Sequence, residues 1–283
     1  MIERRASGLE AVELASALLQ RARLADLEDS HSFWEAADVQ WWWRTQRPTD
    51  ELAHPFWCDD EGPVAAVYAT DFRGTTQCDL LAVPGVDRTA LWVHLLDVLQ
   101  AVPEPVEIPI RDDDAELREL AIGAGLVAAT HDSTAWLGAE RPQHAPADGF
   151  VLVDRANPRG TPHPMRGRNG DAVEARLRST SLYDPALDLA VETVDGEVAG
   201  YSLYWFDPAT KVGLVEPMRV NDDFQRRGLA RAMLTEGNAR LDRRGAERIK
   251  IGFESERAGP LYRSMGFGVT STATWFRRPS GLQ

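Results

Sequence analysis

The residues best suited to chemistry form the run Gln225-Arg226-Arg227-Gly228-Leu229-Ala230. This run lies between a strand-like segment and a helix-like segment, so it would expose backbone N–H groups at the positive end of a helix. Gly228 lets the main chain approach a ligand closely, and the two arginines add positive charge. Such a turn suits a pyrophosphate group. A basic glycine turn can also be an ordinary solvated helix start, so the surrounding elements must decide between the two interpretations.

The second half of the chain predicts strands that alternate with helices. Residues 187–207 indicate a hairpin around Asp195-Gly196. Residues 212–220 are strand-like, and Pro217 within them marks an edge or a bulge because proline cannot donate to a ladder. Further strands are expected at 150–154, 248–253 and 267–276, and helices at 171–181, 228–245 and 258–265.

The first half shows the same alternation more faintly. A short amphipathic helix and a strand at 115–138 repeat the order found at 258–276, which indicates an internal duplication. A stretch rich in proline and alanine at 139–148 separates the halves. The other expected elements are strands at 63–72, 78–83 and 105–110 and a helix at 88–102. We therefore predict a mixed α/β (α+β) fold in two tandem domains, at 1–140 and 148–283, with a linker at 141–147.

The charge is distributed unevenly along the chain. Residues 1–147 hold 11 arginines, no lysine and 26 acidic residues, a net charge of −15, whereas residues 148–283 carry +2, which gives the total of −13. The acidic half would repel nucleic acid and anionic lipid and attract cationic ligands, although acidic residues also simply keep a surface soluble. There is no apolar run of about 18 residues and no secretory signal at the start, so we expect a cytoplasmic protein.

Cysteine and histidine suggest no chemistry. Cys58 and Cys78 are the only cysteines, and neither belongs to a metal-ligand pattern. The six histidines are scattered without an i, i+4 pair or a nearby nucleophile motif. We expect neither a disulfide framework nor a metal site, and we assign the histidines no role.

The order of elements in the second half resembles that of the GNAT superfamily of N-acetyltransferases. The signature of that family is Gln or Arg, two residues, Gly, one residue, and Gly or Ala, after a strand that ends in Val and before Leu-Tyr and Gly-Phe pairs. This chain has Val220, the run 225–230, Leu261-Tyr262 and Gly266-Phe267 at those places. The resemblance covers residues 150–277 and implies acetyl-coenzyme A as co-substrate and no metal.

The resemblance also implies a coenzyme site. Backbone N–H groups of residues 226–231 would bind the pyrophosphate, and the strand edge at 218–220 would pair with the pantetheine arm as an added strand does. Many members contact the coenzyme through an Asn seven residues before the tyrosine; this chain has Ser255 there, and its hydroxyl can still form a hydrogen bond. The expected coenzyme-binding residues are Met218, Arg219, Val220, Gln225, Arg226, Arg227, Gly228, Leu229, Ala230, Arg231 and Ser255.

Acetyl transfer from a thioester to an amine needs a neutral amine, a polarised carbonyl and an acid for the departing thiolate. The resemblance implies that Tyr262 is the acid, and the N–H of Val220 is the candidate donor to the carbonyl oxygen. Glu216 is the candidate base because strand alternation places it on the face of Met218 and Val220. Family members commonly carry this glutamate two residues upstream, where this chain has Leu214, so Glu216 is either a base or a structural or substrate-binding carboxylate. The alternative bases or amine ligands are Glu254, Glu256 and Asp184.

In the first half the equivalent turn would follow Val83. There the chain carries Pro84-Gly85-Val86-Asp87-Arg88-Thr89, which lacks the signature and places Asp87 where a phosphate would lie. We therefore predict a degenerate GNAT-like domain that has lost coenzyme binding. The tryptophan-rich segment from Phe33 to Trp57 either walls a substrate cleft or fills the core, and core filling is the more common role.

The leading prediction is a tandem GNAT enzyme that acetylates a primary amine of a small, cationic molecule. Its layout and its use of arginine over lysine are similar to mycothiol synthase and related actinobacterial acetyltransferases, although no motif singles out that reaction. The alternative is a non-catalytic acyl-CoA sensor, and a purely structural module would require the run 225–230 to be coincidental. We expect no nucleic-acid or membrane partner, and a monomer or homodimer.

Overall fold

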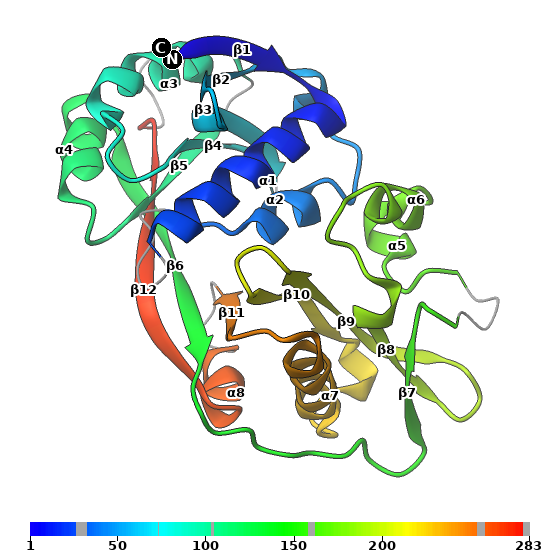
Figure 1. The fold of residues 1–283 in the computed structure, drawn as a ribbon. Coiled ribbons are helices and arrows are strands. Elements are labelled where there is room, and N and C mark those ends of the chain that lie inside the picture. The colour runs from blue at the N-terminus through cyan, green and yellow to red at the C-terminus, as the bar shows by residue number, and fades with distance from the viewer. Residues whose placement is uncertain (27–32, 73, 103–104, 158–161, 254–257, 280–283) are drawn as a thin grey trace. The chain divides into compact units, whose positions relative to one another are not determined.

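The computed structural model describes residues 1–26, 33–72, 74–102, 105–157, 162–253 and 258–279 (Figure 1). It consists of two compact units: unit 1 comprises Met1–Ser133 and Ser271–Gln283, and unit 2 comprises Thr134–Thr270. Both units combine helices with strands, and both contain parallel as well as antiparallel strand pairs. The predicted mixed α/β class is therefore confirmed.

Unit 1 has the strand order β1-β2-β3-β4-β5-β12. Strands β1 to β4 pair antiparallel, β4 and β5 pair parallel, and the end of β12 runs antiparallel to β5. The elements are β1 (Ile2–Ala6), α1 (Gly8–Ala25), α2 (Ala36–Trp42), η1 (Pro48–Glu51), β2 (His54–Asp59), β3 (Gly62–Phe72), β4 (Thr75–Ala82), α3 (Arg88–Ala101), β5 (Val106–Arg111), α4 (Ala115–Gly123), the first part of β6 (Val127–Leu137) and the last part of β12 (Phe267–Arg277).

The core of unit 1 lies between α3 and its sheet. Leu91, Leu95 and Leu99 follow a helical spacing and are all buried. They pack in one cluster with Val67 and its neighbours two positions away on β3, since alternate strand residues share a face. Each large apolar side chain removed from water in this way contributes roughly 1.5–3 kcal/mol. The helix α1 packs against β3 and β4.

Unit 2 has the strand order β6-β11-β10-β9-β8-β7. Strands β7 to β10 pair antiparallel, and β10 runs parallel to β11. The elements are the end of β6, β7 (Phe150–Asp154), α5 (Arg166–Asn169), α6 (Val173–Arg178), η2 (Pro185–Leu187), β8 (Asp188–Thr193), β9 (Val198–Asp207), β10 (Val212–Val220), η3 (Asp222–Phe224), α7 (Leu229–Arg244), β11 (Arg248–Phe253), α8 (Gly259–Ser264) and the start of β12.

The helix α7 lies across β8, β9 and β10 (Figure 1). One side of the helix is buried, with Leu229, Met233, Gly237 and Leu241 one turn apart, and Gly237 is in contact with the ring of Tyr204. A Cβ at Gly237 would lie 1.9 Å from Tyr204 Cζ, so only glycine allows the helix to approach this closely. The Tyr204 hydroxyl also donates to the Met233 carbonyl at 2.7 Å. These contacts fix the height and rotation of α7 on the sheet.

The compact units differ from the boundaries expected from the sequence. Residues 141–147 are not a free linker but part of unit 2, where the N–H of His144 donates to Thr235 Oγ1 at 3.1 Å and that hydroxyl donates to the Pro142 carbonyl at 3.3 Å. The end of β12 belongs to unit 1, because Ala273 to Arg277 pair with β5. Pairing between segments so distant in sequence has no local signal, which is why composition placed the boundary differently.

The chain begins with a strand that precedes its first helix. Ile2 to Ala6 form β1, which pairs with β2 from Ile2↔Cys58 to Ala6↔His54. The helix begins only at Gly8, whose φ of +60° turns the chain out of the strand.

Candidate functional site

The site is built on β10. The pairing of this strand with its parallel neighbour β11 ends part-way along β10. The register with β11 runs from Val212↔Arg248 to Val215↔Ile251. The register with β9 then shifts at a bulge and resumes from Met218↔Ser202 to Val220↔Gly200. Pro217 follows a cis peptide bond inside this bulge, where its missing N–H interrupts no regular ladder. Of the two positions expected for Pro217, edge or bulge, the structure has the bulge.

At the end of β10, the backbone N–H and C=O groups of alternate residues point away from β9. The N–H of Asn221 donates to the Ala199 carbonyl at 2.9 Å, so residues 221 and 199 form a hydrogen-bonded antiparallel pair. Because backbone direction alternates along a strand, the N–H and C=O of Val220 and Met218 point to the opposite side. On that side the pairing with β11 has already ended within the described residues. The edge at 218–220 therefore has the direction that an added extended ligand requires.

The start of α7 has open backbone donors. Gly228 is the N-cap with φ +76°, and Arg226 also has a positive φ of 62°, so left-handed residues alternate with right-handed or extended ones. Such an alternation turns successive N–H groups toward one concave point. The first bond of the helix is from the Ala232 N–H to the Gly228 carbonyl at 3.1 Å, so the N–H groups of residues 229–231 precede it. No side chain caps this end.

The polar side chains of the turn are held at its rim. Gln225 donates to Asp222 at 2.9 Å, and Arg227 donates to the Asp223 carbonyl at 3.1 Å. The Arg227 guanidinium also lies 5.4 Å from the centre of the Phe224 ring. Arg226, Arg227 and Arg231 are all exposed. The turn thus presents positive charge together with backbone donors, which is the arrangement that an anion needs.

Tyr262 is positioned by aromatic packing. It lies on α8 with 7% exposure, and its ring centre is 5.4 Å from that of Phe253 and 6.2 Å from that of Phe267. Burial raises the pKa of the phenol above its usual value, and the negative charge of Glu216 raises it further. The phenol therefore holds its proton at neutral pH, which is the form that a proton or hydrogen-bond donor requires.

Glu216 lies at the bulge of β10 and is half-buried. Strict alternation does not hold across the bulge, so the face on which Glu216 lies does not follow from counting along the strand, and its place beside Met218 and Val220 stays a prediction. The electrostatic effect on Tyr262 nevertheless places the Glu216 carboxylate near the phenol. Its backbone carbonyl accepts a 2.8 Å hydrogen bond from the indole of Trp205, a residue with no exposed surface.

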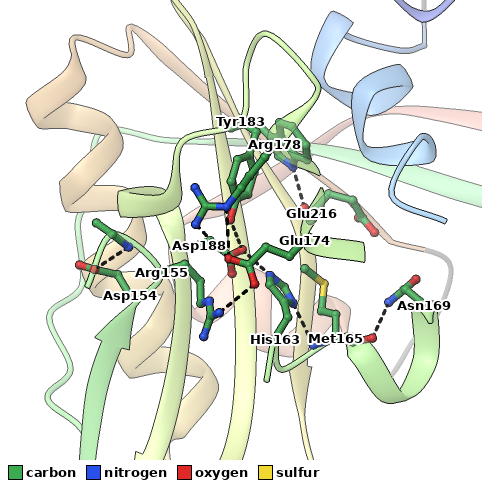
Figure 2. A network of polar contacts seen from close by, with 12 residues as sticks. Asp154, Arg155, His163, Met165, Asn169, Glu174, Arg178, Tyr183, Asp188 and Glu216 are labelled. Atoms are coloured by element: carbon green, nitrogen blue, oxygen red, sulfur yellow. Dashed lines mark hydrogen bonds and ion pairs between the residues drawn. The ribbon is translucent and has the colours of Figure 1, made fainter. Parts of the chain in front are cut away.

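A polar network continues from Trp205 into the sheet (Figure 2). The Tyr183 ring meets Trp205 edge-on at 6.3 Å, and its hydroxyl donates to Asp188 Oδ2 at 2.8 Å. The same oxygen lies 2.8 Å from His163 Nε2. The N–H of Met165 donates to His163 Nδ1 at 3.2 Å, so Nδ1 is the unprotonated nitrogen and Nε2–H donates to Asp188. This network anchors the loop before α5 to β8, and it reaches β10 through Trp205.

A second ion-pair group stands beside this network. Glu174 on α6 accepts from Arg155 at 2.9 Å and from Arg178 at 2.9 Å. Arg178 also lies 5.9 Å from the centre of the Tyr183 ring. These contacts hold α6 against the strands, as Figure 2 shows.

Sequence reasoning singled out the turn, Tyr262 and Glu216 but not the residues that contact them. Trp205 has the pattern of an ordinary core residue in a strand, and His163 and Asp188 are separated by α5, α6 and η2. Asp184, one of the alternative bases, caps η2 by accepting from the Ala186 N–H at 2.8 Å and pairs with Arg244. Ser255, Glu254 and Glu256 lie outside the described residues.

Two further findings concern the described part of the chain only. It contains no group of three or more His, Cys, Asp or Glu side chains placed to hold a metal ion. None of its helices combines the length and the apolar character needed to cross a membrane.

Comparison with known proteins identifies the family of this site. Residues 163–267 match the family model of the Acetyltransferase (GNAT) family. This segment contains the turn at the start of α7, the bulge of β10 and Tyr262. The comparison with curated proteins gave no match.

Solved structures are similar over the whole chain. A tandem GNAT protein from the clavulanic acid biosynthesis pathway has 15% identity and a TM-score of 0.69, with coverage of 100% of this chain and 99% of the other. A GCN5-related N-acetyltransferase from Sphaerobacter thermophilus has 20% identity and a TM-score of 0.61, with coverage of 98% and 96%. One from Kribbella flavida has 13% identity and a TM-score of 0.56, with coverage of 92% and 96%. The chain therefore carries a GNAT acetyltransferase domain at residues 163–267, within a fold that it shares over its whole length with tandem GNAT proteins.

Proposed function

We propose that the protein transfers an acetyl group from acetyl-coenzyme A, as co-substrate, to a primary amine of a small molecule. The observation that carries this proposal is the uncapped, basic start of α7 beside the end of β10 that has left β11. The first feature suits the pyrophosphate and the second suits an extended arm with amide groups. A GNAT domain alone supports acyl transfer from an acyl-CoA, so acetyl specificity and the acceptor belong to the proposal.

In this proposal the residues of the turn bind and orient the coenzyme. The N–H groups of residues 226–231 hold the pyrophosphate, and Gln225 and the arginines form the charged rim. Met218 and Val220 offer backbone N–H and C=O groups to the pantetheine arm. The backbone groups of Arg219, which lies between them, face β9. The pairing would continue the sheet on the side where β11 has diverged.

The chemical step requires three groups. The Val220 N–H donates to the thioester carbonyl oxygen as negative charge develops on it. Glu216 accepts, directly or through water, the proton that the neutral acceptor amine loses as its nitrogen forms the new C–N bond. Tyr262 donates its phenol hydrogen to the sulfur as the C–S bond breaks, and its raised pKa keeps that hydrogen in place beforehand. Transfer of the proton from Glu216 to the Tyr262 phenolate, through solvent, restores both groups.

The acceptor is proposed to be a small, cationic amine. Residues 1–147 carry a net charge of −15, which raises the local concentration of cations near the protein and lowers that of nucleic acid. The same charge supports a protein without nucleic-acid or membrane partners. We expect a monomer or a homodimer in the cytoplasm.

Two measurements test the proposed function. Isothermal titration of the full chain should show acetyl-CoA binding, and the absence of binding would refute the enzyme and the sensor alike. Thiol release should then be followed with acetyl-CoA and a panel of primary amines. Amine-dependent release supports transfer, whereas tight coenzyme binding without release from any amine supports a non-catalytic acyl-CoA sensor.

A further inference from the structure

Unit 1 contains a cavity at the place where β4 and β5 diverge. Within the described residues, the two strands pair in parallel at Thr76↔Val106 and Gln77↔Glu107 and no further along β4. Beyond these pairs, the strand ends and the side chains above them enclose about 40 Å³. A water molecule needs about 10–15 Å³ on this measure, so the space suits three or four small non-hydrogen atoms. Among its lining residues are Phe33, Trp34, Asp79, Trp92, Ile110 and Leu117.

Asp79 is the buried acid of this cavity, with 3% exposure. One carboxylate oxygen accepts from the Trp34 indole N–H at 2.6 Å and the other from the Gln77 amide at 2.6 Å. Both donors are neutral, and a carboxylate can accept about four hydrogen bonds. Two acceptor positions thus remain for a ligand. Burial, with a smaller contribution from the negative charge of Asp38, raises the pKa of Asp79 to about 7 against the opposing effect of the two donors.

The arginines near the cavity do not balance this acid. Arg88 lines the cavity and is paired with Asp114 and, at 3.1 Å, with Glu116. Arg111 also lines it and donates to Asp113 at 2.9 Å. Because each guanidinium is engaged by its own carboxylate, the charge of Asp79 has no cationic counterpart among the described residues. A buried carboxylate without a cation is costly, and a cationic ligand would remove that cost.

The aromatic wall is rigid and suits a cation. The Trp34 ring is packed edge-on by Phe33 at 4.7 Å, by Trp42 at 5.0 Å and by Trp275 at 6.4 Å. These neighbours hold the indole N–H on Asp79. Aromatic rings attract ammonium groups through their negative faces and also cover short alkyl groups.

We propose that this cavity binds the primary ammonium group of a small aliphatic amine. Asp79 is its counter-ion, and the rings of Phe33, Trp34 and Trp92 surround the first carbons of its chain. The size of the cavity limits the buried part to the ammonium group and one or two carbons. This binding goes beyond the proposed acetyl transfer and needs no coenzyme, so it can be measured whether or not unit 2 is an enzyme.

The test is an NMR titration of the full chain without coenzyme. The protein carries ¹⁵N-labelled tryptophan, and the indole resonance of Trp34 is identified by its loss in Trp34→Phe. Methylammonium and ethylammonium should shift this resonance, whereas methanol and ethanol should not. This readout reports the cavity in unit 1 and is insensitive to an amine that binds only at the acceptor site of unit 2.

Asp79→Asn should weaken ethylammonium binding at least tenfold. Asp97→Asn is the control, because it removes an exposed acid of α3 in unit 1 that does not line the cavity, and it should change the affinity less than twofold. Thermal unfolding checks that both variants fold. If Asp79→Asn does not fold, the pH dependence of the native protein decides: the affinity should rise between about pH 6 and 8, because Asp79 must lose its proton while the amine, with a pKa near 10, stays charged.

The other charged groups near Asp79 are Asp38, Arg88, Arg111 and Asp114. Equal shifts with amine and alcohol, an unchanged affinity in Asp79→Asn, or no amine binding at millimolar concentrations would each overturn the proposal. Asp79 would then be a protonated core acid.

Discussion

The two units begin an equivalent helix in opposite ways. In unit 1, α3 follows β4 and its N-cap is Asp87, whose carboxylate accepts from the Ala90 N–H at 3.0 Å. In unit 2, α7 follows β10 and η3, and its N-cap is Gly228, which offers no side chain. A capping carboxylate satisfies a backbone donor and places a negative charge at the positive helix end. A side chain therefore satisfies a backbone donor at the start of α3 in unit 1, whereas no side chain does so at the start of α7 in unit 2, where the donors are open to an anion.

The neighbouring residues reinforce this difference. Arg88, next to the cap of α3, is paired with Asp114, whereas Arg226 and Arg227, before the cap of α7, are exposed. Both units have a pair of parallel strands that part beside the helix. In unit 1 the strand ends enclose a small aromatic cavity with Asp79, and in unit 2 the strand carries Glu216 near Tyr262. One architecture thus carries different polar groups in its two copies, according to a few side chains at the same places.

The largest expected effect comes from giving α7 the cap of α3. Gly228→Asp should weaken acetyl-CoA binding about 100-fold or more, because a carboxylate there competes for the backbone donors and repels the pyrophosphate. Isothermal titration measures the affinity. Gly228→Asn is the control, because asparagine also tolerates a positive φ but carries no charge, and it should cost less than about tenfold. Equal losses in both variants would show that backbone shape, and not charge, distinguishes the two helix starts.

The second prediction concerns the acid of unit 2. Tyr262→Phe should lower kcat about 100-fold with little change in the KM for acetyl-CoA, because the ring packing stays and only the proton donor is lost. In the unaltered protein the pKa of this phenol is raised above 10, so its ionisation should cause no loss of activity as the pH rises from about 7 to 10. Steady-state thiol release measures both. An unchanged kcat in the variant would remove Tyr262 from the proposed chemistry.

The third prediction concerns the support of Glu216. Trp205→Phe removes the donor to the Glu216 carbonyl and should lower kcat about tenfold, with a loss of roughly 2 kcal/mol in the free energy of unfolding. Tyr204→Phe is a matched control, since it removes the buried hydrogen bond from the Tyr204 hydroxyl to the Met233 carbonyl of α7. The control should lose about 1 kcal/mol in stability and keep its kcat. If both variants lose activity in proportion to stability, Trp205 has no special role in positioning Glu216.

The smallest effect is expected at the cap of unit 1. Asp87→Ala should lower the free energy of unfolding by about 1 kcal/mol, because the α3 donor loses its partner. It should not create a second coenzyme site, because Arg88 stays paired with Asp114. Denaturant unfolding and the stoichiometry of acetyl-CoA binding, expected to be one per chain, provide the two measurements. A stoichiometry of two in the unaltered protein would contradict the view that unit 1 has lost its coenzyme site.

Local sequence signals located most of the elements around the site. The strand expected at 248–253 is β11 (Arg248–Phe253), and the helix expected at 228–245 is α7 (Leu229–Arg244) with Gly228 and Gly245 as its caps. These predictions succeeded because period, glycine caps and a basic last turn act within a few residues of one another. The same holds for the hairpin of β8 and β9 around Gly196, which has a positive φ.

Contacts between distant segments were not predictable in this way. Three contacts depend on the fold as a whole: the pairing of β12 with β5, the pairing of β1 with β2, and the hydrogen bond from the Trp205 indole to the Glu216 carbonyl. The bulge after Val215 also shifts the strand register, so counting along the sequence does not give the face of Glu216. For the coenzyme-binding side chain expected at Ser255, the prediction lies outside the described residues.

The sequence by itself determined the chemistry that is available: a glycine turn with two arginines, a tyrosine on a short helix and a glutamate beside a proline. Residue type and short spacing are sufficient for this, because helix starts and caps are local structures. Only the tertiary structure decided how these groups meet. It brought the charge of Glu216 near Tyr262 and enclosed Asp79 with Trp34 in unit 1, because burial and proximity come from packing between segments that are far apart in the chain.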